Sequence, residues 1–268
     1  MEPVFVSGGG IADDVLNELK VNQAVGTKSL NLDAVRKAAP KPAFFICSLG
    51  NHNDRMEEAI SRLEDRSGTI AVAFTPYSYE SDKLFRAAVQ LRRISRMVDA
   101  VFLVDRRAMG EEYRQVPEKQ LEAGMLRGVL ELIRCSLGKE VDLSKFDHDG
   151  KHIYILLHSS SAVRDGMNEL ILNSLKLADR VTGIRVLYAS DAATVADGEY
   201  LDRGIGLLEA ERTIRITEGK DELVGLVEGT SKLFDYDPVA RILGEDRTLD
   251  LEPEVEVNMA FPGLERID

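Results

Sequence analysis

Residues 69–74 read Thr-Ile-Ala-Val-Ala-Phe, residues 81–97 read Ser-Asp-Lys-Leu-Phe-Arg-Ala-Ala-Val-Gln-Leu-Arg-Arg-Ile-Ser-Arg-Met, and residues 100–104 read Ala-Val-Phe-Leu-Val. The first and third runs are short and wholly apolar, which is typical of strands that are covered on both faces. The middle run has apolar residues at helical spacing with arginines between them, so it predicts a basic amphipathic helix. Together they predict two parallel strands joined by a helical crossover.

The same alternation extends to the N-terminus. Residues 43–47, Ala-Phe-Phe-Ile-Cys, predict another buried strand, and residues 55–65 predict the helix that follows it. Residues 4–6, Val-Phe-Val, predict a first strand, and residues 11–20 predict an amphipathic helix behind it. Strands and helices that alternate in this way predict an α/β fold, a Rossmann-like parallel sheet with crossover helices on both faces.

The pattern changes after residue 138. Residues 120–135 are apolar around most of a helix circumference, so we expect a central helix that is buried on several sides. Beyond it, four strands and two helices are expected, at residues 153–157, 184–188, 213–217 and 255–260 for the strands and 167–177 and 222–234 for the helices. We therefore expect two lobes, residues 1–138 with the parallel sheet and central helix, and residues 139–268 as a smaller α+β lobe.

Composition and charge limit the kinds of partner. Acidic residues outnumber basic ones by 46 to 34 among the 268 residues, and the net charge is −12. Such a surface repels phosphate backbones, so we expect no nucleic-acid partner. The N-terminus lacks the features of a secretory signal, and no apolar run is long enough to span a bilayer. We expect a cytoplasmic protein without direct membrane insertion, in which Cys47 and Cys135 are reduced core residues.

A glycine run follows the first expected strand and precedes a helix. Ser7, Gly8, Gly9 and Gly10 would let the backbone approach a phosphate, and the helix N-terminus would supply free N–H donors. Three glycines can also form a simple tight turn, and the carboxylates of the following Asp13 and Asp14 oppose a nearby phosphate. This run alone leaves both interpretations open.

Histidines and aspartates are frequent between residues 147 and 158. A turn followed by a strand accounts for these residues, because their spacing does not place several ligands on one helical face. We therefore predict no metal site there.

The order of five stretches resembles the tubulin/FtsZ superfamily of GTP-dependent filament proteins. They are residues 4–10, 69–80, 94–104, 128–143 and 242–260. The resemblance implies a nucleotide-binding lobe, a central helix and a smaller activation lobe. It also implies GTP or GDP as the cofactor, with Mg²⁺ only where a nucleotide binds, and another copy or a tubulin/FtsZ-like homologue as the partner.

Several positions depart from the family pattern. The family's second glycine loop is replaced here by Gly-Asn-His-Asn-Asp over residues 50–54. The asparagines that bind ribose and guanine in the family align with Arg106 and Lys119, which cannot accept a hydrogen bond. Asp142 matches the first acidic position of the catalytic loop, but the second, catalytic position is Lys145, and an ammonium group cannot orient water as a carboxylate does.

Two segments are short compared with the family. Residues 21–32 are polar and lack strong periodicity, so no strand is expected in them, and residues 33–39 predict only a short helix. The region before Ala43 therefore has too little length for the family's second strand and its loops in full. The chain also stops at Asp268, soon after the last expected strand, so we expect no adaptor-binding tail.

The resemblance assigns a set of candidate site residues. For nucleotide or phosphate these are Ser7, Gly8, Gly9, Gly10, Gly50, Asn51, Asn53, Glu80, Arg106 and Lys119, with Asp142 as the catalytic candidate. Glu80 would lie in the loop beside the ribose. The alternative interpretation is a set of surface charges that close an empty pocket, or a site adapted to another anion.

Three functions remain open. The first is a divergent tubulin/FtsZ-like protein with weak or no GTPase activity, which acts in cell division or cell shape through self-assembly or as a partner of a filament-forming homologue. The second is an active GTPase of a cytoskeletal polymer, in which Asp147 or Asp149 supplies the missing carboxylate. The third is a monomeric binding module for another nucleotide or phosphorylated ligand, held by Arg106 and Lys119.

Overall fold

The computed structural model describes residues 4–8, 11–21, 28–31, 42–51, 55–63, 68–107, 125–126, 128–130, 133, 152–159, 162–219 and 221–236. Residues 1–236 form one compact unit and residues 237–268 a second. The second unit lies outside the described residues, and so do the expected helix at residues 33–39, the expected strand at residues 255–260 and the stretch at residues 242–260.

The first half of the described chain alternates strands and helices as expected. Its elements are β1 (Val4–Ser7), α1 (Ile11–Val21), β2 (Lys28–Asn31), β3 (Ala43–Ser48), α2 (Arg55–Ser61), β4 (Thr69–Phe74), α3 (Ser81–Ile94) and β5 (Ala100–Val104). Strands β1, β3, β4 and β5 pair in parallel in that order. This confirms the predicted α/β class and the Rossmann-like sheet.

Strand β2 was not expected. Its residues pair in parallel with β1, from Val4 against Lys28 to Ser7 against Asn31. The prediction that residues 21–32 hold no strand is therefore wrong. The sequence Lys-Ser-Leu-Asn at this edge of the sheet is short and polar, so it has no apolar run or alternation from which a strand could be predicted.

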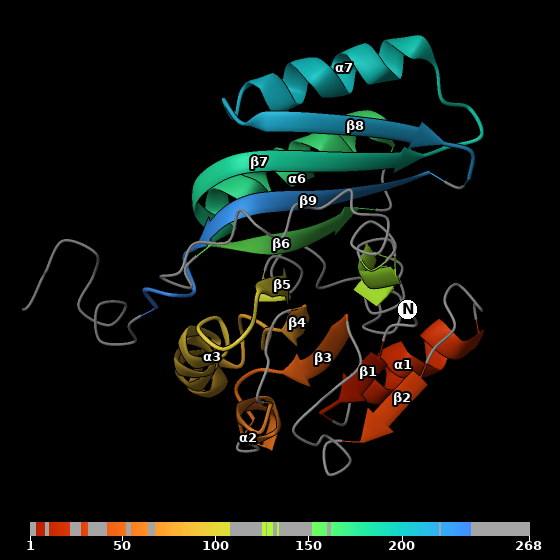
Figure 1. The fold of residues 1–268 in the computed structure, drawn as a ribbon. Helices are drawn as coiled ribbons and strands as arrows, with labels where there is room; N and C mark the ends of the chain where they lie inside the picture. The colour runs from red at the N-terminus through yellow and green to blue at the C-terminus, as the bar shows by residue number, and fades with distance from the viewer. Residues whose placement is uncertain are drawn as a thin grey trace, which may run out of the picture. The chain divides into compact units, whose positions relative to one another are not determined.

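The second half extends the same sheet. Its elements are β6 (His152–Ser159), α6 (Val163–Leu177), β7 (Ala178–Ala189), α7 (Val195–Gly206), β8 (Glu211–Thr217) and β9 (Glu222–Ser231). The described strands form one nine-stranded sheet in the order β2-β1-β3-β4-β5-β6-β9-β7-β8, as Figure 1 shows. Strands β5 and β6 pair in parallel from Phe102 against Tyr154 to Val104 against Leu156. The proposed lobe boundary at residue 138 lies outside the described residues, and the strands on its two sides share this sheet.

Residues 222–234 do not form the expected helix. Residues 222–231 are strand β9, which lies between β6 and β7 and is antiparallel to both. A Cβ atom on Gly225 would lie 2.3 Å from Leu170 Cδ1, and one on Gly229 would lie 1.9 Å from the Arg180 carbonyl oxygen. The two glycines therefore let neighbouring elements approach the strand closely. The apolar spacing alone resembled a helix, whereas the glycines and β-branched residues favour a buried strand.

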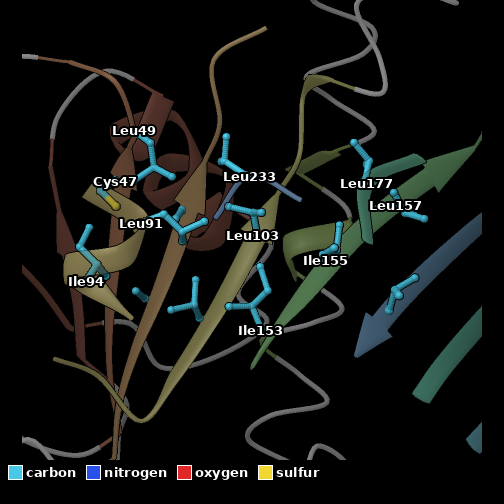
Figure 2. Close-up of a cluster of buried hydrophobic side chains, with 14 of the residues drawn as sticks. Cys47, Leu49, Leu91, Ile94, Leu103, Ile153, Ile155, Leu157, Leu177 and Leu233 are labelled. Atoms are coloured by element: carbon cyan, nitrogen blue, oxygen red, sulfur yellow. The ribbon is translucent and has the colours of Figure 1, made fainter. Parts of the chain in front are cut away.

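Helices cover both faces of the sheet. Side chains of α2, α3, α6 and α7 pack on one face, together with Leu233 and Phe234 from the segment after β9. Figure 2 shows part of this cluster, with Leu233 among the side chains of β5 and α3. On the other face, α1 packs with helical residues of the expected central helix, where Met125, Val129 and Ile133 are fully buried. A Cβ atom on Gly128 would lie 3.0 Å from Leu156 Cδ2, so this helix lies close against β6.

The parallel strands end at one edge of the sheet. Because β1, β3, β4 and β5 run in the same direction, the loops after Ser7, Ser48, Phe74 and Val104 leave the sheet on the same side. We call this side the carboxyl edge. It is the side at which α/β sheets bind ligands.

Candidate functional site

The candidate site lies at the carboxyl edge. The described part contains Ser7, Gly8, Gly50, Asn51, Glu80 and Arg106 of the predicted set. The other predicted residues, Gly9, Gly10, Asn53, Lys119 and Asp142, lie outside the described residues, as does Lys145.

The loop after β1 is held against β3. The Gly8 N–H donates to the Ile46 carbonyl at 2.9 Å, so this amide is not directed to a ligand. A Cβ atom on Gly8 would lie 3.2 Å from Ile46 O and from Met56 Cε, which explains a glycine at this close approach. The Ser7 hydroxyl donates to Asp13 Oδ1 at 2.5 Å. A carboxylate therefore lies at the place where the resemblance puts a phosphate.

Side chains of α3 hold the loop after β3. The Gly50 N–H donates to Gln90 Oε1 at 2.6 Å, and Gln90 Nε2 donates to the Asn51 carbonyl at 2.9 Å. Arg86 Nε donates to the Gly50 carbonyl at 3.0 Å. Gly50 has a φ of +84°, and a Cβ atom there would lie 2.7 Å from Lys83 O, so only glycine fits without strain. Side chains of α3 therefore bind the N–H and carbonyl groups of Gly50 and the carbonyl group of Asn51.

Glu80 links the loop after β4 to the start of α3. Its Oε2 accepts from the Tyr77 N–H at 3.0 Å, and its Oε1 accepts from Lys83 Nζ. Partial burial raises the pKa of Glu80, but hydrogen bonds from Lys83 and the Tyr77 N–H and the charges of Lys83 and Arg106 outweigh it, so the pKa lies below its usual value. Glu80 is thus an ionised acceptor whose two oxygens already have partners.

Arg106 and two tyrosines form a stack beside Glu80. Arg106 Cζ lies 4.5 Å from the centroid of the Tyr77 ring, a cation–π distance. The Tyr77 and Tyr79 rings are stacked, with centroids 5.2 Å apart and planes 7° apart. The Arg106 N–H donates to Thr75 Oγ1 at 2.8 Å, and its Nε donates to the Thr75 carbonyl. We call Arg106, Tyr77 and Tyr79 the aromatic stack.

A buried ion pair lies directly after β5. Asp105 is 1% exposed, and its carboxylate accepts from Arg107 Nε at 2.8 Å and Nη2 at 2.5 Å. Asp105 Oδ1 also accepts from Thr75 Oγ1 at 3.2 Å. Burial lowers the pKa of Arg107, but the charge and hydrogen bonds of Asp105 raise it above the usual value. This pair fixes the backbone on which Arg106 lies.

The structure brings Glu80 and Arg106 together around Tyr77, and it places Gly50 next to Pro76 of the same loop, 2.9 Å from a Cβ atom built on Gly50. Sequence reasoning missed Tyr77, Tyr79, Gln90 and the Asp105–Arg107 pair. The two tyrosines stood in the stretch that carried the family resemblance, so their position in a loop after a parallel strand was a usable signal. The local sequence of α3 has no feature that predicts the contact of Gln90 with the loop after β3.

Two negative findings concern the described residues alone. Within the ranges that the structure describes, no group of His, Cys, Asp or Glu side chains is arranged to hold a metal ion. In the same ranges, no helix combines the length and apolar character that crossing a bilayer requires.

The fold is similar to solved structures of FtsZ and CetZ proteins. An FtsZ dimer, empty, from M. jannaschii is 15% identical, with a TM-score of 0.58 over 85% of this chain and 88% of that chain. CetZ from Methanosaeta thermophila strain DSM 6194 is 13% identical, with a TM-score of 0.54 over 88% of this chain and 90% of that one. The GDP-bound monomer of CetZ1 from Haloferax volcanii is 13% identical, with a TM-score of 0.51 over 91% and 97%.

No protein-family model matches the sequence, and the search of curated proteins gives no match. The structural likeness extends over nearly the whole chain at low identity, so it shows the fold: this chain has the tubulin/FtsZ-like fold. This confirms the resemblance inferred from the sequence.

Proposed function

We propose that this chain is a divergent tubulin/FtsZ-like protein that acts through self-association, or as a partner of a filament-forming homologue, with weak or no GTPase activity. The observation that carries the proposal is the likeness of its fold to an FtsZ structure described as a dimer, over 85% of this chain. Its place is the cytoplasm, in cell division or the control of cell shape.

The hydrogen bonds at the carboxyl edge support self-association that depends only weakly on nucleotide. In nucleotide sites of this kind, backbone N–H groups of glycine loops bind phosphate oxygens. Here the N–H groups of Gly8 and Gly50 donate to Ile46 and Gln90 of the protein itself. The described backbone at Gly8 and Gly50 is therefore held by the protein's own groups, and a surface that is already held in place can bind a neighbouring subunit at lower entropic cost.

Weak hydrolysis follows from the residue at the catalytic position. By the family alignment Lys145 stands where a carboxylate would orient the attacking water, and Asp142 alone does not replace it. An active GTPase remains the alternative, since the CetZ1 structure is described as GDP-bound and Asp147 or Asp149 could supply a carboxylate. An active GTPase of this kind would release phosphate at a rate that rises more steeply than linearly with protein concentration.

Sedimentation velocity tests self-association directly. The full chain is measured over a wide range of concentrations, without nucleotide and with GTP and Mg²⁺. We expect particles heavier than the 29.7 kDa monomer, growing with concentration and nearly unchanged by GTP. A monomer at every concentration, alone and mixed with a filament-forming homologue, would refute the proposal.

A further inference from the structure

Strand β8 lies at one end of the described sheet. It pairs with β7, and within the described residues its other side has no neighbouring strand. Such an edge carries a row of N–H and carbonyl groups that can pair with another strand. Five of the seven residues of β8 are exposed and the other two are half-buried, so this edge is accessible from solvent in the described part of the chain.

The hydrogen bonds to β7 show which residues of β8 direct their backbone groups outward. The Thr217 carbonyl accepts from the Ser190 N–H at 2.9 Å, so the backbone groups of Thr217 point toward β7. Successive residues of a strand point their N–H and carbonyl groups to opposite sides. The backbone groups of Arg212, Ile214 and Ile216 therefore point away from β7, toward the edge.

The side chains of β8 divide between two faces. Arg212 Nε donates to Asp202 Oδ1 of α7 at 2.6 Å. Ile216 Cδ1 would lie 3.3 Å from a Cβ atom built on Gly198 of the same helix. The even-numbered side chains therefore face α7. The exposed side chains on the opposite face belong to odd-numbered residues, namely Glu211, Thr213 and Arg215.

We propose that two copies of this chain pair through β8 as antiparallel strands, with Thr213 of each copy on the two-fold axis. The pairing assigns an interface to self-association, so it rests on the proposed function. In this register Arg212 of one copy and Ile214 of the other exchange backbone hydrogen bonds. Both copies use the same residues, so the contact closes at a dimer.

The charges of β8 favour this register and a second copy as the partner. With Thr213 on the axis, Glu211 of each copy lies directly opposite Arg215 of the other. Opposite charges at opposed positions stabilise an antiparallel pair, and like charges destabilise it. Both side chains also have contacts within their own chain, but a carboxylate and a guanidinium group can each form several hydrogen bonds. Charges on an edge usually prevent pairing, whereas this order of charges complements itself.

Exposed apolar side chains lie at both ends of this edge. Val195, at the start of α7, is 82% exposed, and Ile216, at the end of β8, is 39% exposed. Both line an open groove of about 510 Å³ between α7 and β8. Leu207, directly after α7, is 76% exposed. Because the paired strands are antiparallel, the Leu207 end of one copy lies beside the Val195 end of the other, where burial of these side chains favours the dimer.

Sedimentation velocity of charge variants of the full chain tests this interface. Thr213→Lys places two ammonium groups opposite each other on the axis, and it should weaken the dimer by about tenfold. Asn168→Lys is the matched control, since Asn168 is exposed on α6 and the variant has the same net charge. It should associate as wild type does.

A charge exchange tests the contact between Glu211 and Arg215. Either Glu211→Arg or Arg215→Glu puts like charges at two positions of the dimer, so each should weaken association by about tenfold. The double variant, Glu211→Arg with Arg215→Glu, restores opposite charges and should restore association. Recovery in the double variant cannot come from a general loss of stability, because both substitutions are still present.

Oxidative cross-linking tests the register. In this pairing the two Thr213 residues form a non-hydrogen-bonded pair, whose Cα atoms are about 4.5 Å apart, within reach of a disulfide. Thr213→Cys should therefore form a covalent dimer. Arg215→Cys should not, because its two copies would lie roughly 14 Å apart along the strands. Wild type, oxidised in parallel, controls for Cys47 and Cys135.

The possible results separate this interface from the proposed function. Wild type that self-associates while Thr213→Lys associates equally well would overturn the β8 pair and leave the proposed function intact, and so would Thr213→Cys that forms no disulfide dimer. Wild type that is monomeric alone but binds a filament-forming homologue would also overturn only the pairing of two copies. Wild type that is monomeric both alone and in that mixture would refute the proposed function and the interface together.

Discussion

Two side chains at the carboxyl edge, Glu80 and Arg106, could be predicted from the sequence, but their contacts could not. Both were identified from the family resemblance, and the structure places both around Tyr77. Their partners could not be predicted, because local sequence does not indicate contacts between distant residues. Gly50 and Gln90, whose hydrogen bond closes the loop after β3, are 40 positions apart in the chain.

The lowered pKa of Glu80 predicts a pH-dependent contribution to stability. Because the folded chain favours the ionised form, Glu80 stabilises the fold above the ordinary glutamate pKa, and this contribution is lost as pH falls through its lower folded-state pKa. Glu80→Gln should therefore lower the free energy of unfolding at neutral pH by about 1 kcal/mol, discounted for partial exposure. Urea unfolding at several pH values measures this difference.

The difference between wild type and Glu80→Gln should shrink as pH falls below the ordinary glutamate pKa and through the lower folded-state pKa of Glu80, where the wild-type carboxyl also becomes neutral. Asp82→Asn is the control, since Asp82 lies on the same helix but its side chain is 74% exposed beside Arg86. A difference that grows with acidification would contradict the assignment.

Among the helices and strands, the pattern of burial explains which elements could be predicted from the sequence and which could not. Strands β4 and β5 have the bounds that were predicted, because continuous apolar runs between polar turns allow few other structures. Strand β9 was mistaken for a helix because a run buried on both faces has no alternation to reveal its period. Helix α7 was not predicted, and its glycines at 198, 204 and 206 weaken the helical signal.

The glycines of β9 provide a test of the finding that this segment is a strand and not a helix. Gly229→Ala should destabilise the protein by about 3 kcal/mol, because the added methyl group would collide with the Arg180 backbone rather than with a flexible side chain. Gly198→Ala is the matched control, since its new methyl would meet only Ile216 Cδ1, at 3.3 Å, inside a helix. Thermal unfolding compares the two, and equal stability would contradict the close packing of β9 against β7.

At the scale of the whole molecule, the continuous sheet was beyond prediction. The sequence predicted two sets of strands, but whether β5 and β6 pair depends on contacts between residues some 50 positions apart, such as Phe102 and Tyr154. Their rings lie 5.5 Å apart and are both buried. The fold class and the family resemblance were predictable because they depend on the order of elements, which local patterns reveal.

Because β5 pairs with β6, we expect one cooperative unfolding transition for the described sheet. Apolar side chains cross from β5 to β6 on both faces, so loss of one part exposes the other. Tyr154→Ala should lower the free energy of unfolding by about 4 kcal/mol, and the loss should be seen in β3 as well as in β9. Hydrogen exchange of the amides in β3 and β9 measures this, and protection lost in β9 alone would show two independent units.

Phosphate release from GTP, measured at rising protein concentrations on samples whose assembly is followed by sedimentation, distinguishes self-assembly without hydrolysis from an active GTPase. We predict that assembly increases with concentration while phosphate release stays at the background level, because Gln90 binds the backbone of Gly50 and Asn51 and because the family resemblance puts Lys145 at the catalytic position. Phosphate release that rises more steeply than protein concentration would contradict it and would identify an active GTPase.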